Sequence, residues 1–565
     1  MGTDRDTDLI RRDVVAGSVA LSLTAGVAAA LSRRGAADVT SADASTTTAP
    51  SPLPAPTAPA GGSTATSQTV GDGDPTGSPP LTGSQPTAPA ASDPVRELTP
   101  EELRLHVARR LTHGPTEELL AHIEEVGVEG FIGEQLAPGS IDDAECDARL
   151  RPLHRIGDSA AAIAARENRA LLGEKRGRSL ADLRAATVVR AVHSRRQLLE
   201  VVVGMWTDHF NIWGDSGDLR FEKVVDDREV VRRHALGRFA DLLVASAHSP
   251  AMLRYLDNHT SRAEHPNENY ARELLELHTL GAGNHSERDV RDTARVLTGW
   301  SIDDRHRFRF EPDQHDSGPA TVAGWSTPGR AGPGAERDGI DLLVHLARHP
   351  ATARNVAERI ARRFVSDEPS AALVDGLASV YLAHDTAITP VLAAALGSDE
   401  FRRSSGAKYR RPFEFMAATF RALGADLDAK SLAEDRHLDQ LLDRLGHRPF
   451  SWEAPDGYPD VATAWRSPND VVGRWSLASL AAAGHVRGVA VDLPSHHGTI
   501  AGATVGEVVD RVLRSVTPTG AMPTAREAVL AAAGRGQGDP ADDLDHRSLS
   551  MMVAVALSGE ETQRR

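Results

Sequence analysis

The sequence predicts a mainly α-helical protein, on three observations. From about residue 98 onward, apolar residues recur at spacings of three and four, the period of an amphipathic helix. Glycine and proline interrupt this pattern at intervals typical of helix ends. Only a short stretch, Arg307 to Phe310, alternates in the way a strand does. We therefore expect a large multi-helical domain over 98–565, with at most a minor β or irregular insertion near 300–335.

Composition supports a globular protein and limits its partners. The 565 residues are 40% hydrophobic and 25% charged, and the formal net charge is −16. An acidic chain is a poor partner for nucleic acid, because phosphate binding depends on Lys and Arg. The single cysteine, Cys146, excludes an internal disulfide and a cysteine-based zinc site.

The first 97 residues have the composition of an export segment and a linker. Arg11 and Arg12 precede an apolar run over 14–31, so residues 1–37 resemble a twin-arginine signal. A membrane anchor is the alternative, because the run approaches the shortest length that spans a bilayer. Residues 38–97 are mostly Thr, Ser, Ala, Pro and Gly, which predicts a disordered linker. We expect an exported protein, extracellular or attached to the cell envelope, that touches the membrane only through an uncleaved N-terminal segment.

The helical domain begins with a recognisable helix start. Thr99 and Pro100 precede two acids, and Gly114 separates two short amphipathic helices. A helical period then continues through 160–210. This stretch closes on Asp208 and His209, where an imidazole serves as a metal ligand, a general base or a cap for backbone carbonyls.

Further amphipathic helices follow in order. One is expected over 232–247, ended by Ser249 and Pro250. The next stretch ends at Asp257 and Asn258, just before the densest polar pattern of the chain.

That polar pattern occupies 265–300 and predicts two helices. Gly281 and Gly283 end the first helix, and Ser286 is the expected N-cap of the second. One stripe of the first helix is polar and the opposite face is apolar. The polar stripe consists of His265, Glu268, Asn269, Arg272 and Glu276, and the apolar face of Tyr270, Leu274 and Leu277.

Two interpretations of the polar stripe remain open. Arg272 can form ion pairs with Glu268 and Glu276 on a solvated surface, worth about 0.3–0.5 kcal/mol each. Alternatively, the stripe is the acidic floor of a catalytic cleft. Glu268 or Glu273 is then the general acid or base, and Arg272 binds an anionic group.

Residues 265–300 also resemble the sequence of a known protein family. The run NENYARELLELHTLG, followed by DV and ARVLTGW, resembles the signature of the bacterial "domain of unknown function 1800" family. The resemblance extends over nearly the whole chain after the linker. It implies a mostly helical exported protein without an established activity. It also implies a partner, since members are often encoded beside another exported, sulfatase-like family.

Later segments contribute further candidate residues. His315 and Asp316 resemble the family's His-Asp pair, although a lysine that the family tends to place soon afterwards is missing. Helices resume near residue 339 in a stretch that is rich in arginine. A Pro/Gly-rich segment then brings together Trp452, Tyr458 and Trp465, which either line a carbohydrate or hydrophobic pocket or cover the core.

The function predicted from these features is an exported hydrolase or transferase that acts on envelope or extracellular material. His209, His315 and Asp316 complete its cleft or bind a metal. Asp257, Asn258 and Glu268 are candidate ligands for a divalent metal, because hard cations prefer oxygen donors. The alternative is a non-catalytic envelope protein that assembles with another exported protein. A haem or redox protein is a third alternative, although no haem-attachment cysteine motif is present.

Overall fold

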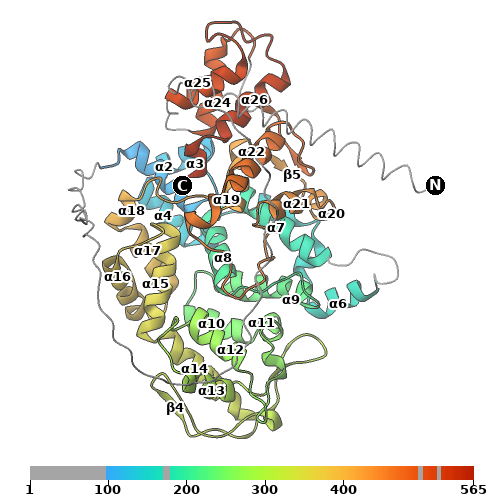
Figure 1. Ribbon diagram of the computed structural model, residues 1–565, viewed down its shortest axis with the longest axis vertical. Helices are drawn as coiled ribbons and strands as arrows, with labels where there is room; N and C mark the ends of the chain where they lie inside the picture. Colours follow the sequence, from blue (N-terminus) through green and yellow to red (C-terminus); the bar gives the residue numbers. More distant parts are fainter. Residues whose placement is uncertain (1–96, 170–177, 494–499, 518–522) are drawn as a thin grey trace, which may run out of the picture. The chain divides into compact units, whose positions relative to one another are not determined.

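A computed structural model describes residues 97–169, 178–493, 500–517 and 523–565. The predicted export segment and all but the last residue of the predicted linker lie outside these residues. The described chain is mainly helical with small two-stranded sheets, which confirms the predicted fold class (Figure 1). None of its helices has the length and apolar character needed to span a bilayer.

The first described helix begins as predicted. Thr99 caps the first described helix through a capping box with Glu102, and Pro100 occupies its first turn. The elements of this region are α2 (Pro100–Leu111), α3 (Glu117–Val126), α4 (Val128–Leu136), η1 (Pro138–Ser140), α5 (Ala144–Leu150), η2 (His154–Gly157) and α6 (Ala160–Arg169).

The helical period predicted to run through 160–210 is broken at Ser194, so this prediction was wrong there. α7 (Arg178–His193) ends and α8 (Gln197–His209) begins a few residues later. The break has a long-range cause. The carboxylate of Asp143 accepts hydrogen bonds from Ser194 Oγ and from the backbone N–H of Arg195, both at 2.7 Å. That N–H is therefore not available to continue the helix.

The helix predicted over 232–247 begins later than expected. α9 (Leu219–Asp226) continues into the π-helical turn η4 (Asp227–Arg232), and α10 (Phe239–Ala247) starts only after a turn and an isolated β-bridge from Arg238 to Ala387. Backbone hydrogen bonds from Phe239 to Thr386 and from Ile388 to Gly237 hold this stretch away from the helical path. Pro250 opens α11 (Pro250–Tyr255), which confirms the predicted break, and η5 (Asn258–Thr260) follows.

The central stretch forms the two predicted helices, but the boundaries of the first helix differ from the prediction. Asn267 caps α12 (Glu268–Glu273), which passes into a π-helical turn, η6 (Leu274–His278). Gly281, with a φ of +86°, closes this turn by donating its N–H to the carbonyl of Leu275. Ser286 caps α13 (Glu287–Val296) as predicted, through a capping box with Asp289.

The predicted β insertion is present at 300–335. β1 (Trp300–Ile302) pairs antiparallel with β2 (Phe308–Phe310), with Trp300 opposite Phe310. β3 (Ala320–Val322) pairs in the same way with β4 (Trp325–Thr327). The turns η7 (Pro312–Gln314) and η8 (Gly332–Ala335) complete the insertion.

Helices predominate in the described residues after 335. They are α14 (Glu336–Ala347), α15 (Pro350–Phe364), α16 (Ala371–Ala383), α17 (Ile388–Leu396), α18 (Asp399–Arg403), α19 (Pro412–Ala422), α20 (Ala429–Glu434), α21 (His437–Arg444), η9 (Ala462–Trp465), α22 (Pro468–Ala482), α24 (Val505–Val516), α25 (Pro523–Ala533), α26 (His546–Leu557) and α27 (Glu560–Gln563). A third small sheet pairs β5 (Asp426–Leu427) with β6 (Val489–Ala490).

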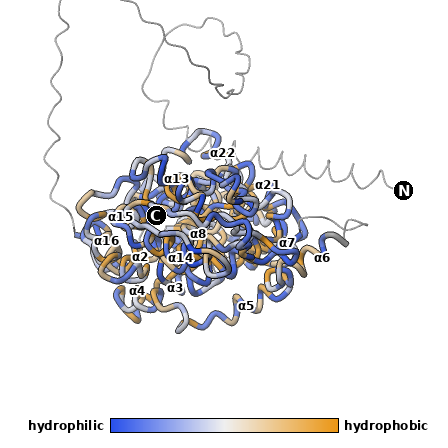
Figure 2. The backbone as a smooth tube through the Cα atoms, turned by 90° about the horizontal axis from the view of Figure 1, so that it is seen from below, coloured by the Kyte–Doolittle hydropathy of each residue, from blue (hydrophilic) through white to orange (hydrophobic). Residues whose placement is uncertain are grey.

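The apolar side chains gather in two large cores and a small one. The first core contains α8, α10 and α15, and the second contains α7, α19, α22 and α24. The small core includes Ile163, Leu183 and Phe450. Hydrophobic and hydrophilic residues alternate within single helices, as expected when each helix buries one face (Figure 2).

Candidate functional site

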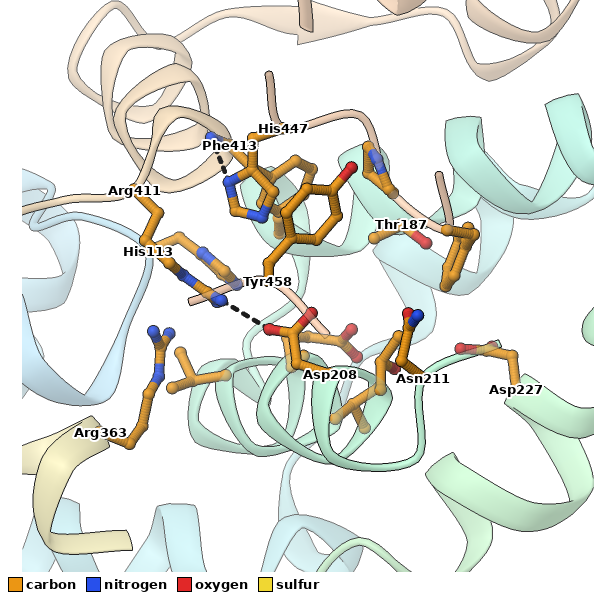
Figure 3. Close-up of a pocket in the computed structure, with 18 of the residues that line it drawn as sticks. His113, Thr187, Asp208, Asn211, Asp227, Arg363, Arg411, Phe413, His447 and Tyr458 are labelled. Atoms are coloured by element: carbon orange, nitrogen blue, oxygen red, sulfur yellow. Dashed lines mark hydrogen bonds and ion pairs between the residues drawn. The ribbon is translucent and has the colours of Figure 1, made fainter. Parts of the chain in front are cut away.

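A cavity of about 70 Å³ lies where side chains of the three cores meet. Val201 comes from the first core, Phe413 from the second and Phe450 from the small one. A space of this size holds about two water molecules, at the roughly 30 Å³ that each occupies in the liquid. Its polar lining comes from α7, α8, η4, α15, the start of α19 and the segment 447–458, and includes Thr187, Glu200, Asp208, Asn211, Asp227, Arg232, Arg363, Arg411, His447 and Tyr458 (Figure 3).

Asp208, in the last turn of α8, is the carboxylate best placed for chemistry. Its side chain lines the cavity, and the residue is only 8% exposed. Oδ2 accepts a hydrogen bond from Arg411 Nη1 at 2.5 Å, whereas Oδ1 accepts none from any described residue. Burial raises the pKa of Asp208, and the guanidinium of Arg411 opposes this effect only in part. The result is a buried acid with one oxygen that remains available to a ligand.

Two histidines in the cavity wall are neutral. Burial lowers the pKa of His113 to about 3 and that of His447 well below its usual range. His447 Nδ1 accepts the backbone N–H of Phe413 at 3.3 Å, so the ring carries its hydrogen on Nε2. His447 therefore adds a neutral N–H donor to the site.

A second set of charged residues in the cavity wall forms ion pairs among its own members. Arg232 donates through Nε to Asp227 at 2.8 Å and through both Nη atoms to Glu200 at 2.9 Å. All three nitrogens of the guanidinium are thereby used, and both oxygens of Glu200 are engaged. These residues shape the cavity, and one Asp227 oxygen accepts no hydrogen bond within the described part of the chain.

The segment 447–460 covers the cavity and is held by backbone contacts. Asn211 Nδ2 donates to the carbonyls of Trp452 and Ala454, at 3.0 and 2.7 Å. Gly457 has a φ of +73°, and a Cβ at this position would lie 2.0 Å from the carbonyl oxygen of Asp208. Only glycine permits this close approach. The segment is thus fixed directly to the end of α8 that carries Asp208.

The three aromatic residues predicted to gather in this segment do not share one environment. Tyr458 and Trp465 are buried and pack against His447, with ring centroids 4.4 and 5.1 Å away, and Tyr458 also lines the cavity. Trp452 is half-buried and lies outside the cavity lining, where it donates to Asp456 at 2.7 Å. Tyr458 therefore fits the predicted pocket lining, and Trp465 fits the predicted role of covering the core.

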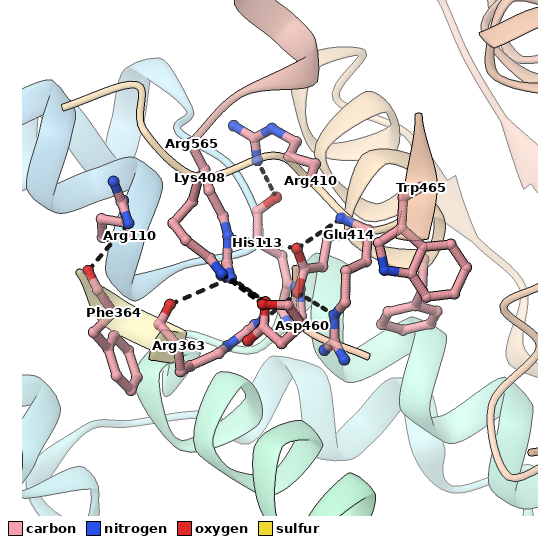
Figure 4. Close-up of polar contacts among 12 residues, drawn as sticks. Arg110, His113, Arg363, Phe364, Lys408, Arg410, Glu414, Asp460, Trp465 and Arg565 are labelled. Carbon is pink, nitrogen blue, oxygen red and sulfur yellow. Dashed lines mark hydrogen bonds and ion pairs between the residues drawn. The ribbon is translucent and has the colours of Figure 1, made fainter. Parts of the chain in front are cut away.

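A buried ionic network adjoins the cavity and links the first core to the second. Glu414, on α19, accepts hydrogen bonds from Arg363 of α15 and from Arg411, and its other oxygen lies 3.5 Å from Arg565 Nε. Asp460 lies 3.0 Å from Lys408 Nζ. We call this set the ionic network; it comprises Arg110, Asp208, Arg363, Asp367, Lys408, Arg411, Glu414, Asp460 and Arg565. Figure 4 shows part of it, with Arg363, Lys408, Glu414, Asp460 and Arg565 among the labelled residues.

The network keeps two of its acids, Glu414 and Asp460, ionised despite their burial. Burial alone raises the pKa of Glu414, but Arg363, Arg565 and Arg411 together hold it well below its usual range. Lys408 and Arg363 act in the same way and lower the pKa of Asp460. Both acids therefore carry their charge inside the protein.

The central motif lies outside the cavity lining. Glu268 is exposed and forms no ion pair among the described residues. Arg272 donates to both oxygens of Glu287, at 2.9 and 2.8 Å, and lies 3.6 Å from Glu276. The ion pair with Glu276 is confirmed, whereas the expected pair between Glu268 and Arg272 is not present.

Glu273 and His209 also lie outside the cavity lining. Burial raises the pKa of half-buried Glu273, and Glu276 and Asp456 add to the effect. Asp456 belongs to the segment that covers the cavity. His209 follows Asp208 but packs among Trp206, Phe210 and Phe239, and its Nε2 donates to the carbonyl of His278 at 3.1 Å. The structure thus places His209 in the carbonyl-capping position.

His315 and Asp316 support the β insertion. His315 donates through Nδ1 to the carbonyl of Thr298 at 3.0 Å. Asp316 accepts two hydrogen bonds from Arg295, which is the first cause of its lowered pKa. Neither residue lines the cavity.

The metal candidates do not form an obvious ligand set. Asp257 is exposed, and Asn258 is buried, with Nδ2 bound to the carbonyl of Leu297 and Oδ1 without a partner. Across the described parts of the chain, no group of three or more His, Cys, Asp or Glu side chains could hold a metal ion.

Sequence reasoning missed most of the residues that form the site. Asp208 was noticed only as the neighbour of His209, and Arg363 only as part of a basic helix. One local signal was available at α19, because Arg411 precedes a proline and Glu414 follows three positions later, as in a helix start. Nothing local connects Arg411 with Asp208, which lies 203 positions away.

Comparisons with known proteins address the family and leave the activity open. The model of the family described as "Protein of unknown function (DUF1800)" matches residues 106–564. No curated protein and no solved structure matches the chain. The matched range contains the cavity and every residue of the ionic network except Arg565.

Proposed function

Because this chain belongs to the DUF1800 family of proteins of unknown function, we propose its function from the site alone: an exported hydrolase or transferase that acts on envelope or extracellular material, with Asp208 as general acid and base. The observation that carries the proposal is the state of Asp208. It is a buried carboxylate in a cavity wall, with a raised pKa and one unbonded oxygen.

The surrounding groups support this role. The protonated carboxyl of Asp208 gives its proton to a leaving group at the cavity. The carboxylate that remains is stabilised by Arg411 and takes a proton from the attacking water or acceptor hydroxyl, which restores the acid. His447 donates a hydrogen bond through Nε2 to the reacting group without changing its own charge.

The test compares the full chain with Asp208→Asn. Envelope fractions are incubated with each protein, and released reducing ends, amines, fatty acids and phosphate are measured. We expect release by the natural chain and a reduction of about 10²-fold or more in the variant. Asp443→Asn, at a largely exposed acid outside the cavity, should act like the natural chain. Equal release by folded Asp208→Asn would refute the proposal.

A second candidate is a non-catalytic envelope protein that assembles with another exported protein. It is favoured by Arg232, Glu200 and Asp227, which satisfy one another in the cavity wall as a structural network would. A stoichiometric partner recovered from native membranes, together with no release of material by the natural chain, would select this function.

A further inference from the structure

The ionic network contains more basic than acidic side chains. The basic members are Arg110, Arg363, Lys408, Arg411 and Arg565, and the acidic members are Asp208, Asp367, Glu414 and Asp460. Arg359, half-buried and without a hydrogen bond or ion pair among the described residues, adds a further positive charge next to Asp208. The histidines of the cavity are neutral and do not change the balance. An uncompensated charge in a protein interior is costly, so this region favours an anion.

The nitrogens without partners identify where an anion would bind. Arg363 and Arg411 both line the cavity and lie on the same side of Asp208 (Figure 3). Among the described residues, the guanidinium of Arg363 bonds only through Nη1, and its Nε is buried without a partner there. Arg411 uses Nε and Nη1. The Nη2 group of each makes no hydrogen bond among the described residues. Two buried guanidinium groups therefore keep unused donors beside the same cavity.

Arg232 provides the contrast within the same wall. Its three nitrogens are all bonded to Glu200 and Asp227, so it has no unused nitrogen for a ligand. The unused guanidinium donors of this cavity thus belong to Arg363 and Arg411, not to Arg232.

From these observations we infer that Arg363 and Arg411 form a subsite for a small oxyanion, a carboxylate or phosphate group on the substrate. The inference rests on the proposed function, because it assigns a substrate class to the cavity that Asp208 serves. Guanidinium groups suit this ligand, since their planar N–H donors match the oxygens of a carboxylate or phosphate. Arginine also cannot relieve the excess charge by losing its proton.

The subsite and the acid reinforce each other. An anion bound at Arg411 competes with Asp208 for the same positive charge. It therefore favours the protonated form of Asp208, which is the form that donates a proton. Binding of the substrate thus prepares the acid.

The test is thermal melting of the full chain in sodium acetate or sodium phosphate, with ionic strength matched by sodium chloride. We expect a saturable rise in melting temperature with at least one oxyanion. Acetate alone identifies a carboxylate site, and phosphate alone a phosphate site. Arg232→Lys should keep the response, and Arg411→Lys should lose it. No rise beyond the chloride control, or a full response in folded Arg411→Lys, would overturn the inference.

A second variant keeps the test decisive if Arg411→Lys fails to fold. Asp208→Asn removes a negative charge from the subsite, so titration calorimetry should show oxyanion binding several-fold tighter than in the natural chain. Weaker or absent binding would overturn the inference. This measurement is independent of turnover. If Asp208→Asn loses turnover but no oxyanion binding is detected, the subsite is refuted and the proposed acid stands. If oxyanion binding is detected but Asp208→Asn keeps full turnover, the proposed acid is refuted and the subsite stands.

Discussion

Replacement of Glu414 by glutamine should destabilise the protein strongly. The side chain is 2% exposed and is the common partner of Arg363, Arg411 and Arg565. Each pair at 3.0–3.5 Å is worth about 5 kcal/mol at an effective dielectric constant of 20, before the cost of burying the charges is subtracted. Measured losses from breaking such buried pairs are about 3–5 kcal/mol. That is a large part of the roughly 5–15 kcal/mol that stabilises a typical domain.

Urea unfolding of the full chain, followed by circular dichroism, measures this loss as a lower midpoint. Glu124→Gln is the matched control, because Glu124 pairs with Arg104 on the surface. The pKa of Glu414 is lowered on folding, so its contribution is present above the unfolded pKa of about 4.3 and fades as pH falls further. The difference between the two proteins should therefore narrow below about pH 4. A midpoint that matches the control, or a difference independent of pH, would refute the reasoning.

Three further predictions follow from single contacts. Gly457→Ala places a Cβ 2.0 Å from the carbonyl of Asp208, so oxyanion binding and melting temperature should both fall; an unchanged melting curve would contradict the close approach. Glu268→Ala should leave melting temperature and metal content unchanged, because the side chain is exposed without an ion pair among the described residues; a stoichiometric metal lost with Glu268 would restore the central motif as a metal site. Burial lowers the pKa of His113 and His278 to about 3, so unfolding takes up protons below about pH 6.5 and stability should fall from there toward pH 3. His278→Phe should flatten that slope in urea midpoints measured from pH 7 to 4.5, and an unchanged slope would argue against a buried neutral ring.

Features set by neighbouring residues could be predicted from the sequence. Thr99 and Ser286 cap helices because an acid three positions later completes each capping box. Pro250 starts a helix for a similarly local reason. The failures have distant causes. The break at Ser194 depends on Asp143, 51 positions earlier, and the late start of α10 depends on a backbone pairing with 386–388.

The site was less accessible to sequence reasoning than the fold. Density of charged residues drew attention to Glu268 and Arg272, yet exposed ion pairs have the same sequence pattern as a catalytic cleft. Asp208 and His209 are neighbours, but successive residues of a helix point about 100° apart. One therefore lines the cavity and the other enters the aromatic core. The hydrogen-bond partner of Asp208 is Arg411, at the start of α19, and only folding brings the two residues together.

The ionic network also affects how the protein unfolds. Because Arg363 and Glu414 lie on helices of different cores, separation of the cores leaves buried charges without partners on both sides. Partial opening between the cores therefore carries its own free-energy penalty. Native-state hydrogen exchange should show α15 and α19 opening together, with one free energy. The charges at the centre thus join two apolar bodies into one cooperative unit.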